Sequence, residues 1–87
     1  MKRNDNFVLR QIENRHVLSE AEGSQVKLPC KITMSESAVM IWNLLSADRT
    51  LEQLVGAITG EYDVSPEVAE KDIRELLVQM HALALVS

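Results

Sequence analysis

The sequence contains few of the residues that characterise disulfide-rich, glycine-rich or aromatic-rich folds. Its 87 residues include one cysteine, Cys30, which cannot form a disulfide within the chain. The three glycines are scattered, so no glycine-rich loop is present to cradle a phosphate group. Only three residues are aromatic, so the core must consist mainly of aliphatic side chains. This composition favours helices packed on a small sheet over an aromatic-rich β-sandwich.

Long apolar runs and targeting signals are also missing. No stretch approaches the roughly 20 apolar residues that a membrane-spanning helix needs. The polar residues 1–6 are followed by no apolar segment of the kind found in a signal peptide. We therefore predict a cytoplasmic protein that has no membrane partner.

Residues that could carry catalytic or metal chemistry are sparse. His16 and His81, the two histidines, lie far apart in the sequence and lack the spacing of metal ligands. Cys30 has no neighbouring histidine, and a free cysteine is most often a small buried residue. The sequence therefore predicts no metal, no cofactor and no enzyme activity, which leaves binding as the function to consider.

The charge is unevenly distributed along the chain. Residues 1–34 contain six basic and four acidic side chains, a net charge of +2. Residues 35–87 contain three basic and nine acidic side chains, a net charge of −6. Because a protein that reads nucleic acid must meet phosphates with positive charge, the acidic second part of the chain argues against that class of partner.

A short alternating stretch at residues 30–34 runs directly into the most apolar helical pattern in the sequence. Ile32 and Met34 share one side of an extended chain, and Thr33 lies on the other. Ser35 is a good helix N-cap, and the apolar residues that follow share one helical face: Ala38, Ile41, Trp42 and Leu45. We predict a strand followed by a helix with almost no loop between them.

Two further strands precede this one. Residues 7–12 and 16–19 are rich in apolar and β-branched side chains and flank a turn-prone sequence, which predicts an antiparallel pair. Residues 20–29 show no sustained period and are interpreted as a loop, with room for a brief extended piece at residues 26–28. Residues 1–6 are expected to form a frayed, flexible tail.

Capping residues mark the second helix. Thr50 and Gln53 have the spacing of a capping box, in which each side chain accepts a hydrogen bond from the backbone of the other residue. Gly60 is placed to end this helix in the left-handed conformation.

The third predicted helix is amphipathic with one mixed border. Ser65 followed by Pro66 marks its start, and the pattern runs to about residue 81. Its apolar stripe consists of Ala69, Ile73, Leu76, Leu77 and Met80. Beside that stripe on a helical wheel lie Val68, Asp72, Glu75 and Gln79. Residues 83–86 fit either a short extended segment or a last helical turn.

Together these elements predict one α+β domain over residues 1–87, with a three-stranded antiparallel sheet followed by three helices. If the strands pair in sequence order, residues 31–34 form a sheet edge to which an extended peptide could add as a fourth strand. Backbone hydrogen bonds contribute only about 0.5 to 1.5 kcal/mol each, so apolar pockets would have to supply selectivity. Alternatively, the edge is covered by the chain's own tail or by a second copy in a homodimer.

Several stretches of the sequence are distinctive in their order and spacing when taken together. They are Phe7-Val8-Leu9-Arg10-Gln11-Ile12, His16-Val17-Leu18, Ile32-Thr33-Met34-Ser35-Glu36-Ser37-Ala38, Ile41-Trp42, Leu44-Leu45, Arg49-Thr50-Leu51-Glu52-Gln53-Leu54-Val55, Glu61-Tyr62-Asp63-Val64-Ser65-Pro66-Glu67 and Asp72-Ile73. In this order they resemble the PqqD-like proteins, the peptide-chaperone domains also called RiPP recognition elements. The resemblance covers nearly the whole chain.

The resemblance implies a winged-helix-like fold and a non-catalytic function. Members of this family hold the leader segment of a ribosomally made precursor peptide and present it to a modifying enzyme, commonly a radical-SAM protein. The leader adds to the third strand and lies against the third helix. Carried onto this sequence, the peptide-binding residues are Lys31, Ile32, Thr33, Met34, Val68, Asp72, Leu76 and Gln79.

A winged-helix DNA-binding regulator is the second hypothesis, because three strands and three helices also form that fold. The third predicted helix holds four acidic and two basic residues, a net charge of −2. A helix that reads a DNA groove should be basic, so charge favours the peptide over nucleic acid as the partner. A structural homodimer paired through the open strand edge is the third hypothesis.

Overall fold

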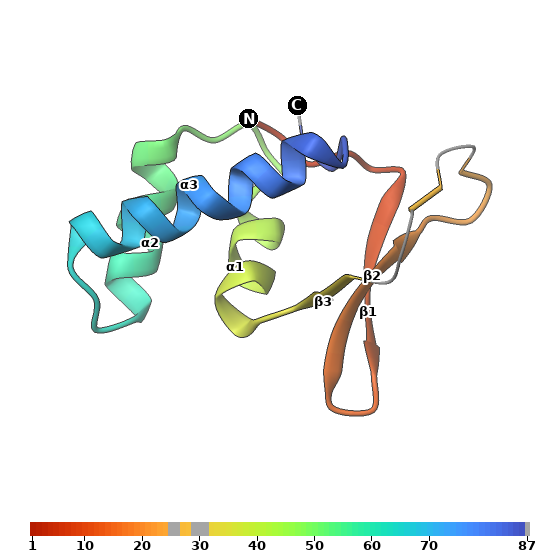
Figure 1. Cartoon of the computed structure of the whole chain (residues 1–87), viewed down its shortest axis with the longest axis horizontal. Helices are drawn as coiled ribbons and strands as arrows, with labels where there is room; N and C mark the ends of the chain where they lie inside the picture. The colour runs from red at the N-terminus through yellow and green to blue at the C-terminus, as the bar shows by residue number, and fades with distance from the viewer. Residues whose placement is uncertain (25–26, 29–31, 87) are drawn as a thin grey trace.

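The computed structural model describes residues 1–24, 27–28 and 32–86. Figure 1 shows a hairpin that projects from one side of the molecule and three helices grouped on the other. The predicted α+β fold, a three-stranded antiparallel sheet followed by three helices, is confirmed. The predictions made for Val26, Cys30 and Lys31 lie outside the described residues. The elements are β1 (Phe7–Ile12), β2 (Arg15–Glu20), β3 (Ile32–Met34), α1 (Glu36–Leu44), α2 (Leu51–Glu61) and α3 (Pro66–Ala82).

The sheet pairs its strands in sequence order, β1-β2-β3, and each neighbouring pair is antiparallel. β1 and β2 are joined by Glu13 and Asn14, which lie between the paired residues Ile12 and Arg15. Glu13 takes a left-handed backbone conformation, with φ of 58°. β3 pairs only with β2, so it forms one edge of the sheet, as the sequence predicted.

The join between β3 and α1 is as tight as predicted. β3 ends at Met34, and the Ser35 hydroxyl accepts a hydrogen bond from the Ala38 N–H at 3.2 Å as the N-cap of α1. The predicted apolar face of this helix is buried, and Trp42 is only 1% exposed. These side chains form one core cluster with residues from the sheet, α2 and α3.

The capping box of α2 is confirmed, but its predicted end is wrong. Thr50 accepts a hydrogen bond from the Gln53 N–H at 3.2 Å, and the Gln53 side chain accepts one from the Thr50 N–H at 2.9 Å. Gly60 lies inside the helix, which continues to its C-cap Tyr62, where φ is −118°. The half-buried Tyr62 packs against the core, so its packing carries the helix past the glycine.

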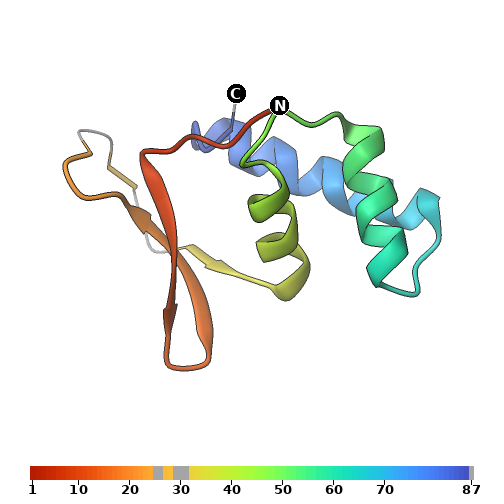
Figure 2. The ribbon, with the colours of Figure 1, turned by 180° about the vertical axis from the view of Figure 1, so that it is seen from behind.

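α3 begins as predicted at the Ser65 N-cap and Pro66 and ends at Ala82. Four of its five predicted stripe residues are buried, and Leu76 is half-buried. α3 lies across α1 and α2 in both ribbon views (Figures 1 and 2). No helix within the described ranges is long and apolar enough to cross a bilayer.

The sequence left two structures open for residues 83–86, and the chain combines parts of both. Ala84 has a left-handed backbone, with φ of 58°. The Ala84 N–H donates to the His81 carbonyl at 3.0 Å, and the Leu85 N–H donates to the Met80 carbonyl at 2.8 Å. This is a Schellman motif that closes α3. Val86 then forms an antiparallel bridge with Arg3.

Residues 1–6 were expected to form a frayed tail, but the structure shows this segment held by hydrogen bonds to the rest of the chain. The Arg3 N–H donates to the Leu45 carbonyl at 2.8 Å, and the Asn4 N–H donates to the Leu85 carbonyl at 2.7 Å. The Arg3 guanidinium also lies 5.7 Å from the centre of the Trp42 ring. Figure 2 shows the N-terminal segment running beside the end of α3, where Arg3 pairs with Val86. The polar segment is held because its backbone pairs with groups remote in the sequence.

We predict that Ala84→Gly raises the free energy of unfolding by up to about 1 kcal/mol. A left-handed backbone costs a residue with a Cβ atom roughly 1 to 2 kcal/mol, and glycine avoids this cost but is more flexible when unfolded. Chemical denaturation measures the change. Ala82→Gly, within the same helical end, should instead destabilise the protein. Equal destabilisation by both variants would contradict the assigned motif.

Candidate functional site

The ladder between β1 and β2 shows which backbone groups face which neighbour. In an antiparallel pair, residues bonded to the partner strand alternate with residues whose N–H and C=O groups face away. The Ala21 N–H donates to the Asn6 carbonyl at 2.7 Å, next to the paired Phe7 and Glu20. Counting every second residue of β2 back from Ala21 reaches Val17. The backbone of Val17 is therefore hydrogen-bonded to β1.

The same alternation leaves the backbone of Thr33 facing outward from β3. Val17 uses its backbone groups on β1, so its neighbours His16 and Leu18 face β3 and pair with Met34 and Ile32. Thr33 stands opposite Val17, and its N–H and C=O therefore point to the outer edge. No described residue bonds to them there. The edge can accept a hydrogen-bonding chain.

A groove runs beside this edge, between β3 and α3. Its narrow section has a volume of about 260 Å³. An extended chain paired with Thr33 would place alternate side chains against apolar atoms of this section. The residues that β3 and α3 contribute to its walls are Ile32, Thr33, Met34, Leu76, Gln79 and Met80.

The groove continues past the end of β3 as a wide section of about 690 Å³. The two sections share wall residues from α1 and α3, so they form one continuous groove. The shared residues are Ser35, Ala38, Leu76 and Gln79. The apolar floor of the wide section consists of Ala38, Ile41, Ile58, Ala69 and Ile73.

The structure brings most of the predicted site residues together. Ile32, Thr33, Met34, Leu76 and Gln79 all line the narrow section. Asp72 lines the wide section. Val68 lines neither section and is 52% exposed on the outside of α3. Lys31 lies outside the described residues.

Other residues of the groove were not predicted. Tyr62 and Val64, on the connection between α2 and α3, line the wide section. Leu83 and Leu85, beyond the end of α3, line the narrow section. One sequence signal could have indicated the first pair, because Tyr62 is one of only three aromatic residues and stands between two acidic ones.

Comparison with known proteins places this geometry in a family. The family model for coenzyme PQQ synthesis protein D (PqqD) matches residues 15–86. The chain belongs to the PqqD family. It is also similar to TbiB1, whose structure was solved in complex with the TbiA(beta) leader peptide, with a TM-score of 0.74 and 27% sequence identity. The similarity covers 98% of this chain and 93% of TbiB1. No curated protein matches the sequence.

In this PqqD family member, the groove offers groups suited to binding. Every buried side chain among the described residues is apolar. Within the same ranges, no three His, Cys, Asp or Glu residues lie together as possible metal ligands. The groove therefore combines backbone hydrogen bonding at Thr33 with an apolar floor and exposed polar walls.

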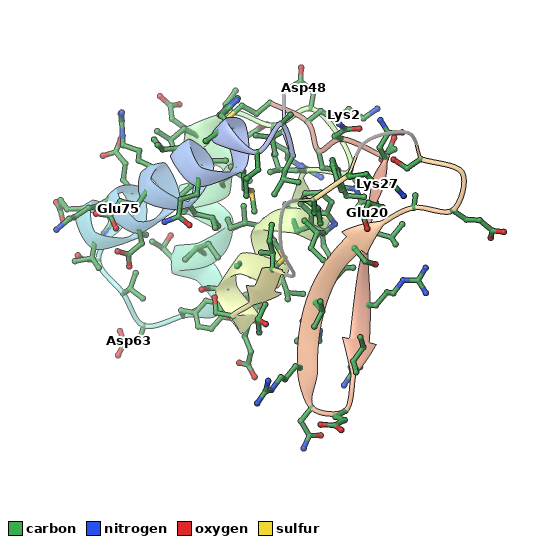
Figure 3. The ribbon with its side chains drawn as sticks, turned by 45° about the vertical axis from the view of Figure 1, so that its right-hand side comes forward. Lys2, Glu20, Lys27, Asp48, Asp63 and Glu75 are labelled. Atoms are coloured by element: carbon green, nitrogen blue, oxygen red, sulfur yellow. The ribbon has the colours of Figure 1, made fainter. Side chains whose placement is uncertain are left out.

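Glu20, at the end of β2, holds the backbone of Leu28. Its carboxylate accepts a hydrogen bond from the Leu28 N–H at 2.7 Å. The pKa of Glu20 is lowered from its ordinary value of 4.5, chiefly because of this hydrogen bond. The positive charge of Lys27 also lowers it. Figure 3 shows Glu20 and Lys27 near each other where β2 ends. The bond ties the end of β2 to Leu28.

We predict that Leu28 exchanges its amide hydrogen faster when this acceptor is removed. Glu20→Leu leaves no acceptor, whereas Glu20→Gln keeps an uncharged one and should give intermediate protection. Because the pKa of Glu20 is lowered by folding, its contribution is complete above pH 4.5 and is lost as the pH falls through the folded pKa. Hydrogen exchange measured by NMR tests this order. Equal protection in all three proteins would refute it.

Proposed function

We propose that this protein binds the leader segment of a ribosomally synthesised precursor peptide and presents it to a modifying enzyme, such as a radical-SAM protein. The leader adds to β3 as an extended strand and lies in the groove beside α3. The protein itself is non-catalytic in this proposal. The predicted cytoplasmic location is part of the same proposal, since such precursors are made there.

The outward-facing backbone of Thr33 beside a groove is the observation that carries the proposal. An edge strand next to an apolar groove is the arrangement used when an extended peptide adds to a sheet. The similarity to TbiB1, which was solved with a leader peptide, supports the same reading of this edge. Ile32, Met34, Leu76 and Gln79 are the proposed side-chain contacts in the narrow section.

The remaining predicted contacts of the proposal lie farther from Thr33. Asp72 lies in the wide section, so a peptide that continues beyond β3 reaches it. Val68 would contact only a peptide that extends past the groove onto the exposed side of α3. Lys31 stays a predicted contact outside the described residues.

The expected affinity is moderate. Each backbone hydrogen bond contributes about 0.5 to 1.5 kcal/mol, and each buried peptide side chain about 1.5 to 3 kcal/mol. A few of each, less the cost of ordering a flexible peptide, correspond to a dissociation constant in the micromolar range or somewhat below it.

The alternative of a DNA-binding regulator is disfavoured by the surface of α3. Glu67, Asp72 and Glu75 are exposed on this helix, and Arg74 is engaged with Glu70 at 3.2 Å. A helix inserted into a DNA groove would bring these carboxylates close to phosphates. A salt-dependent mobility shift with duplex DNA would reverse this ranking.

We predict that Thr33→Pro abolishes or strongly weakens binding of a leader peptide that the wild type binds. Proline removes the outward N–H, while the bonds to β2 come from Ile32 and Met34 and remain. Isothermal calorimetry of the wild type and the variant with the synthetic leader measures the change.

Two control variants separate this effect from general damage to the sheet. Thr33→Val keeps the N–H and the branched shape, so it should bind as the wild type does. Gln11→Pro removes an outward N–H from β1, the opposite edge, and should also leave binding unchanged. Absence of saturable binding to the wild type, or equal loss with Thr33→Val, would refute strand addition. Mass measurement with and without peptide distinguishes a peptide receptor from a fixed homodimer.

A further inference from the structure

Carboxylates are the charged groups that line the wide section of the groove. Glu36 lies in the first turn of α1, and Asp72 and Glu75 lie one turn apart on α3. All three side chains are exposed, and no lysine, arginine or histidine of the described chain lines either section. We call these three residues the acidic rim. Figure 3 shows Glu75 on α3.

Helix stability accounts for only one member of the acidic rim. A negative side chain stabilises a helix when it lies within the first turn, which explains Glu36. Asp72 and Glu75 lie in the middle of α3, where this effect has decayed. Among the described residues, Arg74 pairs with Glu70, and Lys71 forms no ion pair with either rim residue of α3.

The floor beneath the acidic rim is apolar. Ile73, at 4% exposure, follows Asp72 in the sequence, the half-buried Leu76 follows Glu75, and both line the same section. A lysine or arginine side chain matches both surfaces, because its aliphatic stem covers apolar atoms while its charged end stays in water beside the carboxylates. A peptide carboxylate in the same place would be repelled.

We propose that the bound peptide carries a lysine or arginine in the segment that leaves β3 and enters the wide section, and that Asp72 and Glu75 select it. This inference rests on the proposed function. β3 ends at Met34, so backbone pairing stops there and side chains alone determine which peptides continue along the groove. The acidic rim thereby favours basic leaders over acidic ones.

Selection from a random peptide library displayed on phage tests the proposal without a known leader. The library is selected on the immobilised wild type, on Glu75→Lys and on Glu22→Lys. Glu22 is exposed, lies outside the groove and gives the same change in net charge, so it is the matched control. We expect wild type and control to enrich a basic residue at one fixed position beside an extended apolar segment, and Glu75→Lys to lose this enrichment.

A synthetic copy of an enriched peptide gives the quantitative result. Its affinity should fall about five- to tenfold for Glu75→Lys, the range expected when an exposed ion pair is replaced by repulsion, and stay unchanged for the control. Asp72→Asn, which only neutralises a charge, should give a smaller loss in the same direction. High salt should reduce the difference between wild type and Glu75→Lys.

Binding of the same peptide to Thr33→Pro separates the two proposals. If binding requires the Thr33 N–H but neither selection nor affinity depends on Glu75 or Asp72, the inferred preference for a basic residue is overturned and strand addition stands. If the peptide binds Thr33→Pro as tightly as the wild type, or if no peptide is enriched at all, the proposed function itself fails. Circular dichroism verifies that each variant is folded.

Discussion

The direct join between β3 and α1 is the constraint on which the rest of the structure depends. Met34 is buried at the end of the strand, and the next residue, Ser35, already caps the helix. With no loop residue to act as a hinge, the direction of α1 follows from that of β3. Side chains of α3, such as Ile73 and Met80, pack into the same buried cluster as Trp42. The separation of β3 and α3, and hence the groove between them, is therefore set by the core.

Features governed by neighbours in the sequence were predictable, and features governed by remote packing were not. The caps at Ser35 and Thr50 act over three residues, so the residues themselves predict them. The end of α2 was misplaced at Gly60 because the packing of Tyr62 extends the helix. The expectation of a frayed segment at residues 1–6 failed because its backbone partners are Leu45 and Leu85.

The candidate site shows the same division. Thr33 and Leu76 were named as contacts from the family resemblance, and the regular periods of the strand and the helix place both of them on the groove. Val68 lies on the same flank of the helical wheel as Asp72, but it is exposed and lines neither section, although the neighbouring Ala69 lines the wide one. Tyr62 and Val64 line the groove from the connection between α2 and α3. No periodic pattern in the sequence predicts the course of this connection.

The shortness of β3 has a kinetic consequence. Among the described residues the strand has three, and of these Thr33 is the one whose backbone groups both face outward. Such an edge gives a peptide few hydrogen bonds with which to resist dissociation. A micromolar complex that forms at about 10⁶ M⁻¹s⁻¹ has a lifetime of about one second. Under the proposed function, a receptor with this lifetime exchanges its peptide within seconds, so that one copy serves many peptide molecules in succession.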